Sequence, residues 1–387
     1  MEQGTIQILF ALLRSAICGS KLTQEEQDKY SPDMLRDLLE ISSKHDVVHL
    51  VVLGLKQNEL ISKDDMDIKK HILKAVYRYE RIKSEYEKLC DTLEEAQILF
   101  LPLKGSVIRK YYPEAWMRTS CDIDILVHEE DSEKAMSILL NELGYTYEEK
   151  SSHDLSFFTS TNLHIELHYD LVEEGIANES SEVLSSIWDM VTVKEGFSFR
   201  CEMPDEMYYF YHIAHMAKHL ENGGCGIRPF IDLWILDGLQ GSDKEMRDKL
   251  LNQGKLLKFA EVARKLSRIW FEREEYDFIS KQVEDYILRG GVYGNIENRV
   301  VMQQLKRGGR IKYALSKIFL PYDVIKFHYP ILQENRWLTP VMEVRRWCKL
   351  IFCGHLKRTV KEIHYNNSVT SDEAAGAKKF LESIGLH

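Results

Sequence analysis

Three acidic residues have the types and spacing that best fit catalysis in this 387-residue chain. Asp122 and Asp124 lie two residues apart in the segment CDIDILV. On a strand, residues two apart project from the same face with Cα atoms about 6.5 Å apart. Two such carboxylates repel each other unless a cation neutralises them, and hard oxygen ligands suit Mg²⁺ or Mn²⁺. The pair predicts a divalent-metal site, although an exposed strand face with two solvated acids has the same pattern.

The third acid is Glu166, in the segment LHIELHYD. Leu163, Ile165 and Leu167 alternate there with polar residues, so Glu166 projects away from the core together with His164 and His168. A carboxylate from a nearby strand can complete a site for two metals about 3.5–4 Å apart, as phosphoryl transfer requires. We therefore predict Asp122, Asp124 and Glu166 as catalytic and metal-binding residues, with His168 as a possible wall of the cleft.

A short motif, Lys104-Gly105-Ser106, precedes the aspartates and follows an apolar strand-like segment. Glycine lets a phosphate approach the backbone, and the start of a helix offers free N–H groups. The Ser106 hydroxyl can add a donor, and Lys104 or Arg118 can neutralise charge. These four residues are the candidate nucleotide-binding residues.

The elements that must position these residues form an α+β pattern. Residues 1–96 show helical periodicity, including SSKHDVVHLVVLGL and a long charged helix over 75–98. Residues 97–180 read as strand, helix, strand, helix and three further strands. Residues 181–387 are mostly helical again. We therefore predict a compact core over 97–180 between a helical amino-terminal region and a helical carboxyl-terminal domain.

Three histidines, His212, His215 and His219, share one face of a predicted helix. They could bind zinc or iron and so suggest a metal-dependent phosphohydrolase, but carboxylate partners at helical spacing are missing. Polar packing is the simpler interpretation, and His215 and His219 are possible cleft-wall residues. Arg228 and Asp232, four residues apart, predict a local ion pair, and the alternative is that both face the cleft.

Composition narrows the functional classes. With 51 Lys+Arg and 61 Asp+Glu the net charge is −10, which makes long nucleic acid an unlikely partner. The seven cysteines are scattered and include no CxxC pair, so a reducing cytoplasm is the expected location. No segment is apolar enough to predict a membrane span, and we expect no membrane partner.

The segments LPLKGSVIRKYYPEAWMRTSCDIDILV and HIELHYDL resemble the polymerase β-like nucleotidyltransferase superfamily. More closely, the chain is similar to an uncharacterised bacterial nucleotidyltransferase family. The similarity also covers SSKHDVVHLVVLGL, HIAHMAKHLENGGCGIRPFIDL and the GGVYG region. It implies a polymerase β-like core, and Mg²⁺ or Mn²⁺ bound by Asp122, Asp124 and Glu166. It also implies that Gly105 and Ser106 hold the distal phosphates of a nucleoside triphosphate, expected to be ATP.

The predicted activity is transfer of a nucleotidyl group to an unidentified acceptor hydroxyl on a small molecule, a sugar or a protein, with release of pyrophosphate. Two alternatives stay open. One is a non-catalytic nucleotide-binding module that has kept the fold. The other is the histidine-based phosphohydrolase.

Overall fold

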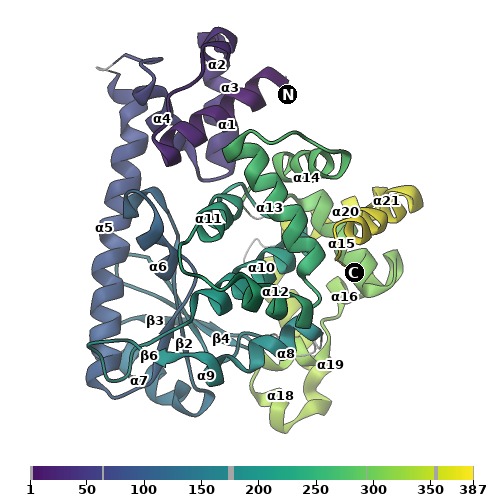
Figure 1. Ribbon diagram of the computed structural model, residues 1–387. Helices are drawn as coiled ribbons and strands as arrows, with labels where there is room; N and C mark the ends of the chain where they lie inside the picture. Colours follow the sequence, from purple (N-terminus) through teal and green to yellow (C-terminus); the bar gives the residue numbers. More distant parts are fainter. Residues whose placement is uncertain (1–2, 63–64, 173–177, 293, 353–355, 387) are drawn as a thin grey trace.

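The computed structural model describes residues 3–62, 65–172, 178–292, 294–352 and 356–386. It contains a mixed five-stranded sheet surrounded by helices (Figure 1). The α+β class predicted from the sequence is therefore confirmed, whereas the polymerase β-like topology and the division at residues 97 and 181 stay predictions.

The sheet has the strand order β1-β2-β5-β4-β3. Strand β2 runs parallel to β5, and the other neighbouring pairs are antiparallel. All five strands fall in segments where the sequence predicted them. Their bounds are Phe100–Pro102 (β1), Asp122–Val127 (β2), Thr146–Lys150 (β3), Asp154–Phe158 (β4) and His164–His168 (β5).

One face of the sheet is apolar and is covered by helices α5 (Met66–Glu95) and α7 (Ser132–Asn141). Ile123 and Ile125 of β2 and Ile165 of β5 belong to one buried cluster with residues of both helices. Because successive side chains of a strand alternate between faces, burying these residues turns Asp122, Asp124 and Glu166 to the opposite face. The core of the sheet thus fixes the direction of the candidate acids.

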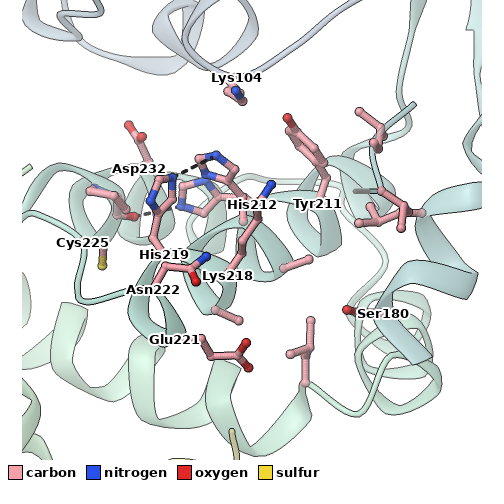
Figure 2. Close-up of a pocket in the computed structure, with 18 of the residues that line it drawn as sticks. Lys104, Ser180, Tyr211, His212, Lys218, His219, Glu221, Asn222, Cys225 and Asp232 are labelled. Atoms are coloured by element: carbon pink, nitrogen blue, oxygen red, sulfur yellow. Dashed lines mark hydrogen bonds between the residues drawn. The ribbon is translucent and has the colours of Figure 1, made fainter. Parts of the chain in front are cut away.

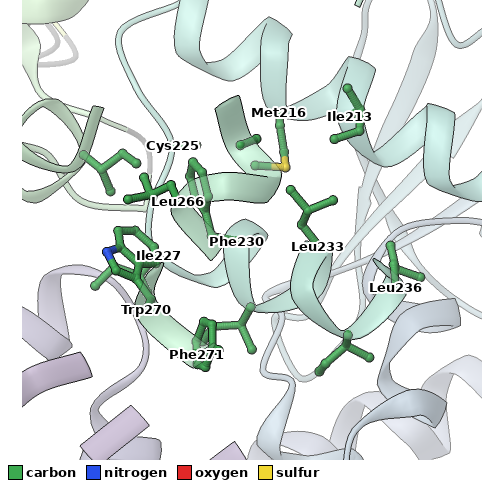
Figure 3. Packing of buried hydrophobic residues seen from close by; sticks show 14 of the residues in the cluster. Ile213, Met216, Cys225, Ile227, Phe230, Leu233, Leu236, Leu266, Trp270 and Phe271 are labelled. Carbon is green, nitrogen blue, oxygen red and sulfur yellow. The ribbon is translucent and has the colours of Figure 1, made fainter. Parts of the chain in front are cut away.

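A second hydrophobic cluster joins helices that are far apart in the sequence. Helices α1 (Gln3–Cys18) and α4 (Val48–Gln57) pack with α10 (Asp205–Glu221), α11 (Arg228–Asp237) and α13 (Leu257–Glu272). Figure 3 shows Ile213, Met216, Phe230, Leu233 and Trp270 in this cluster. The rings of Phe10 and Trp270 stack at 4.1 Å between centroids. This cluster holds α10 and α11 beside the polar side of the sheet.

The glycine of α4 allows one of these close contacts. A Cβ atom on Gly54 would lie 2.4 Å from the carbonyl oxygen of Leu12 in α1. Only a residue without a side chain permits this approach of the two backbones. The helical pattern predicted within SSKHDVVHLVVLGL is confirmed by α4, which is buried on several sides.

The rest of the described chain is almost entirely helical, with one small hairpin formed by β6 (Thr192–Val193) and β7 (Cys201–Glu202), which the sequence pattern did not predict. No helix among the described residues is long and apolar enough to cross a membrane. The remaining helices before the sheet are α2 (Gln24–Lys29) and α3 (Leu35–Lys44); those within and after it are α6 (Gly105–Ile108), α8 (Glu179–Ser185), α9 (Ile187–Met190), α12 (Lys244–Gln253), α14 (Phe278–Arg289), α15 (Ile296–Arg307), α16 (Arg310–Ile318), α17 (Tyr322–His328), α18 (Ile331–Glu334), α19 (Thr339–Phe352), α20 (Leu356–Ser368) and α21 (Ser371–Ser383).

Candidate functional site

A cleft of about 1230 Å³ lies between the polar face of the sheet and helix α10. Side chains of β2, β5, α10 and α11 line it, together with residues of α8 and α15. Figure 2 shows Lys104 on one side of this cleft and His212, His219 and Tyr211 of α10 on the other. The cleft therefore joins most of the residues that the sequence singled out.

The parallel pairing of β2 and β5 brings two of the three candidate acids together. Asp124 lies directly opposite Glu166, and Asp122 lies opposite His164. Asp124 is buried, with 1% of its surface exposed, whereas Asp122 and Glu166 are partly buried and line the cleft. Two acids on one sheet face, held in register by backbone hydrogen bonds, have the arrangement that the sequence predicted for a metal site.

Lys104 supplies the nearest positive charge. Its Nζ lies 2.6 Å from Asp124 Oδ1 and 3.4 Å from Glu166 Oε2. Burial lowers the pKa of the Lys104 ammonium, but the neighbouring negative charges, those of Asp124 and Glu166 among them, together outweigh this effect and the pKa lies well above its usual range. The ammonium is therefore charged and neutralises part of the charge of the two carboxylates.

The backbone of Lys104 is strained, with φ at +45° and ψ at −124°. A side chain rarely adopts this region, and such strain is concentrated at functional sites. The Tyr208 hydroxyl donates a hydrogen bond of 2.7 Å to the Lys104 carbonyl oxygen and thereby links the turn to α10. The fold thus holds this turn in a costly conformation beside the two carboxylates.

His168 also contacts both acids. Its Nε2 lies 3.1 Å from Asp124 Oδ1 and 3.4 Å from Glu166 Oε2. Burial raises the pKa of Glu166, but the hydrogen bond from His168 and the charge of Lys104 prevail and hold that pKa well below its usual range. The Glu166 carboxylate is therefore ionised at neutral pH.

Ligand atoms of Asp124, Glu166 and His168 lie within 4.8 Å of one another, close enough to bind a common metal ion. Asp122 is not part of this group but shares the sheet face with it. Two paired carboxylates and a third acid on the same face are oxygen donors of the kind that fits Mg²⁺ or Mn²⁺.

The two residues of the Gly-Ser turn face different spaces. Gly105 begins the short helix α6 and lines the cleft. Ser106 lines a separate pocket of about 60 Å³, beside Lys110 and Arg200, and its buried Oγ has no hydrogen-bond partner. The nucleotide-binding role of both residues stays a prediction, but the Ser106 side chain is not among those that line the larger cleft.

Arg118 lines the cleft but is already paired. Its Nε donates to both oxygens of Asp232, at 2.8 and 2.9 Å, and the Tyr112 hydroxyl donates to the same carboxylate at 2.6 Å. Arg228 instead donates to Asp46 at 2.9 Å. The ion pair predicted between Arg228 and Asp232 is therefore wrong, since helical spacing did not reveal the closer partners that lie on other segments.

The histidines of α10 split into one residue and a pair. His212 Nε2 donates to the Pro229 carbonyl at 2.9 Å, and the Nε2 atoms of His215 and His219 lie 3.2 Å apart. Burial, followed by the charge of Lys104, lowers the pKa of His219 to about 4. All three line the cleft, yet they do not form a three-ligand metal group among the described residues. This finding weighs against the phosphohydrolase alternative.

Sequence reasoning missed two neighbours of His168, one at the start of β4 and one directly before it. Asp154 lies directly opposite His168 in the antiparallel pair, and His153 precedes it. The segment SSHDLSFF gives no sign of chemistry by itself, because its acid and histidine are adjacent and not spaced as metal ligands. Only the pairing of β4 with β5 places these residues beside His168.

The structure combines a mixed sheet, two paired acids and a polar cleft. The chain belongs to the family described as "Uncharacterised nucleotidyltransferase", whose model matches residues 32–272. Neither the comparison with curated proteins nor that with solved structures gives a match. The family predicted from the motifs is therefore confirmed.

Proposed function

We propose that this protein transfers a nucleotidyl group from a nucleoside triphosphate, with ATP as the expected donor, to the hydroxyl of an acceptor. The observation that carries the proposal is the pairing of Asp124 with Glu166 on neighbouring parallel strands at the cleft. In this reaction the acceptor oxygen bonds to the α-phosphorus. The bond from that phosphorus to the bridging oxygen breaks, pyrophosphate leaves, and the acceptor proton passes to a base or to solvent.

The proposed roles follow from charge and position. Asp122, Asp124 and Glu166 bind Mg²⁺ or Mn²⁺, which neutralises phosphate charge when it is bound. Glu166 lines the cleft, so it can also accept the acceptor proton. Lys104 and Gly105 contact the triphosphate, Lys104 by charge and Gly105 through its backbone. Such chemistry depends on positioning and electrostatics and requires no covalent nucleophile.

The acceptor is proposed to be a small molecule, a sugar or a protein side chain. The cleft lining includes Lys218, Lys255, Lys306 and Arg307, which can offset the charge of a phosphorylated ligand. The net charge of −10 makes long nucleic acid an unlikely acceptor.

The test is incubation of the protein with each α-labelled triphosphate, Mg²⁺ or Mn²⁺ and fractionated acceptors. Asp124→Asn and Glu166→Gln should each lower label transfer by about 10³-fold, because each removes a charge that positions the metal. Glu221→Gln is the matched control: its side chain has the same 23% exposure as Glu166 and lines the same cleft from α10. Full label transfer by Asp124→Asn or Glu166→Gln would contradict the proposal.

A non-catalytic nucleotide-binding module is the second candidate, and one observation favours it. Lys104 and His168 form ion pairs with the carboxylates of both Asp124 and Glu166 and so neutralise part of their charge. Calorimetric titration with ATP, with and without Mg²⁺, separates the two functions. A module of this kind would bind ATP equally well in Asp122→Asn/Asp124→Asn and would transfer no label.

A further inference from the structure

We propose that His153, Asp154 and His168 form a binding site for a divalent transition-metal ion such as Zn²⁺, distinct from the Mg²⁺ or Mn²⁺ site at Asp122, Asp124 and Glu166. The inference goes beyond the proposed function and does not depend on nucleotidyl transfer. One ligand atom from each of the three side chains lies within 4.8 Å of the other two. Two imidazoles and one carboxylate are a donor set for Zn²⁺ and similar ions, whereas Mg²⁺ prefers oxygen ligands.

Backbone pairing holds the three residues together. Asp154 and His168 are direct partners in the antiparallel pair of β4 and β5, so their side chains share a face. The His153 carbonyl accepts hydrogen bonds from the backbone N–H groups of Tyr169 and Asp170, at 2.9 and 3.2 Å. The candidate ligands are thus positioned by the sheet and by the segment that directly follows β5, which favours a preformed site.

The two ring nitrogens of His168 differ in a way that points to a ligand. Nε2 contacts Asp124 and Glu166, whereas Nδ1 is buried and has no hydrogen-bond partner. Buried polar atoms are nearly always paired, so an unpaired one requires an explanation. A histidine that binds a metal usually donates its other ring N–H to a carboxylate. Asp124 supplies that carboxylate, which leaves Nδ1 as the metal ligand.

Asp154 and His153 are the other two proposed ligands of the Zn²⁺ ion. The Asp154 side chain is 12% exposed and that of His153 is 18% exposed, and both line the cleft together with His168. Ser151 Oγ contacts both His153 Nδ1, at 3.1 Å, and Asp154, and it can orient them. Three protein ligands leave one position open for water or a ligand oxygen in the cleft.

The test is calorimetric titration of the chelator-treated, full-length protein with Zn²⁺ in excess Mg²⁺. We expect one Zn²⁺ per chain, and His153→Gln and Asp154→Asn should each weaken binding at least tenfold. His164→Gln is the matched control, because His164 lies on β5, lines the same cleft and belongs to neither three-ligand group. Circular dichroism of each variant checks the fold, and X-ray absorption of the zinc-loaded protein should detect two imidazole ligands.

Three results would overturn the inference. The first is Zn²⁺ affinity unchanged in both His153→Gln and Asp154→Asn. The second is Zn²⁺ binding that depends on Asp122 or Glu166 and not on His153. The third is an absorption spectrum without imidazole ligands. Asp122→Asn separates the two hypotheses: it should abolish label transfer and keep Zn²⁺ binding, so either can fail without the other.

Discussion

Two carboxylate clusters border the cleft, and they differ in the exposure of their side chains and in the partners that neutralise their charges. Asp232 is held by Arg118 and Tyr112, and both members of the ion pair are buried, with side chains 1% and 9% exposed. Asp124 and Glu166 are held by Lys104 and His168, and the side chains of Lys104 and Glu166 are each 23% exposed. The Asp232 ion pair is almost fully buried, whereas the second cluster has two partly exposed members, Lys104 and Glu166, that line the cleft.

The difference indicates which cluster is structural and which can exchange partners. Both oxygens of the Asp232 carboxylate accept hydrogen bonds from buried partners, and losing one partner leaves an unpaired buried charge. The ammonium of Lys104 is a point charge on a flexible chain and can yield its place to another cation. We therefore expect the Asp232 cluster to hold α11 to the segment before β2, and the Asp124 cluster to bind ligands.

The largest effect should come from Asp232→Asn. This change leaves the Arg118 guanidinium without its buried counter-ion and should lower the free energy of unfolding by about 3–5 kcal/mol. Asp124→Asn is the matched change in the other cluster, where Lys104 keeps Glu166 as a partner, and it should cost about 1–2 kcal/mol. Urea denaturation followed by circular dichroism measures both. Equal losses of unfolding free energy in the two variants would contradict the proposed difference between the clusters.

A smaller effect is expected when Lys104 is removed from the Asp124 cluster. Lys104→Met should raise the affinity of Asp124 and Glu166 for Mn²⁺ about tenfold, or 1.4 kcal/mol, because the metal no longer competes with the ammonium. The measurement is electron paramagnetic resonance of free Mn²⁺, in proteins that also carry His153→Gln so that the second proposed site does not contribute. Lys218→Met, a change of the same charge on α10, is the control. Equal Mn²⁺ affinity with and without Lys104 would show that it is not a competing counter-ion.

The smallest effect should appear across the cleft, at His219. Burial and the charge of Lys104 lower its pKa to about 4, below the usual 6.5. The unfolded chain therefore takes up this proton at higher pH, and His219 lowers stability progressively as the pH falls from about 6.5 towards 4. In Lys104→Met the pKa of His219 should rise from about 4 and this pH window should narrow. Titration of the His219 ring signals by NMR measures the shift, and an unmoved pKa would contradict the coupling.

Much of the local structure could be predicted because it depends on short-range patterns. Alternation in CDIDILV and LHIELHYD identified both strands and showed which side chains share a face. The long helix α5 was predicted from 75–98, although it begins at Met66. The hairpin of β6 and β7 was missed because its strands are two residues long and too short to show alternation.

Partners that are distant in the sequence could not be predicted. Arg118 and Asp232 are 114 positions apart, and their pairing replaced the local ion pair that helical spacing favoured. His153 and Asp154 meet His168 only through the pairing of β4 with β5. Lys104 lies in a strained turn with a positive φ. A lysine before a Gly-Ser motif does not reveal this backbone conformation in the sequence.

The sequence by itself determined the family, the α+β class and the face on which Asp122, Asp124 and Glu166 lie, because strand geometry ties a two-residue period to a common side. Tertiary structure alone decided that β2 and β5 are parallel neighbours, with Asp124 opposite Glu166 and the Lys104 ammonium in contact with both carboxylates. Strand register and ion pairing depend on contacts between segments that are distant in the sequence, and the order of residues along the chain does not specify those contacts.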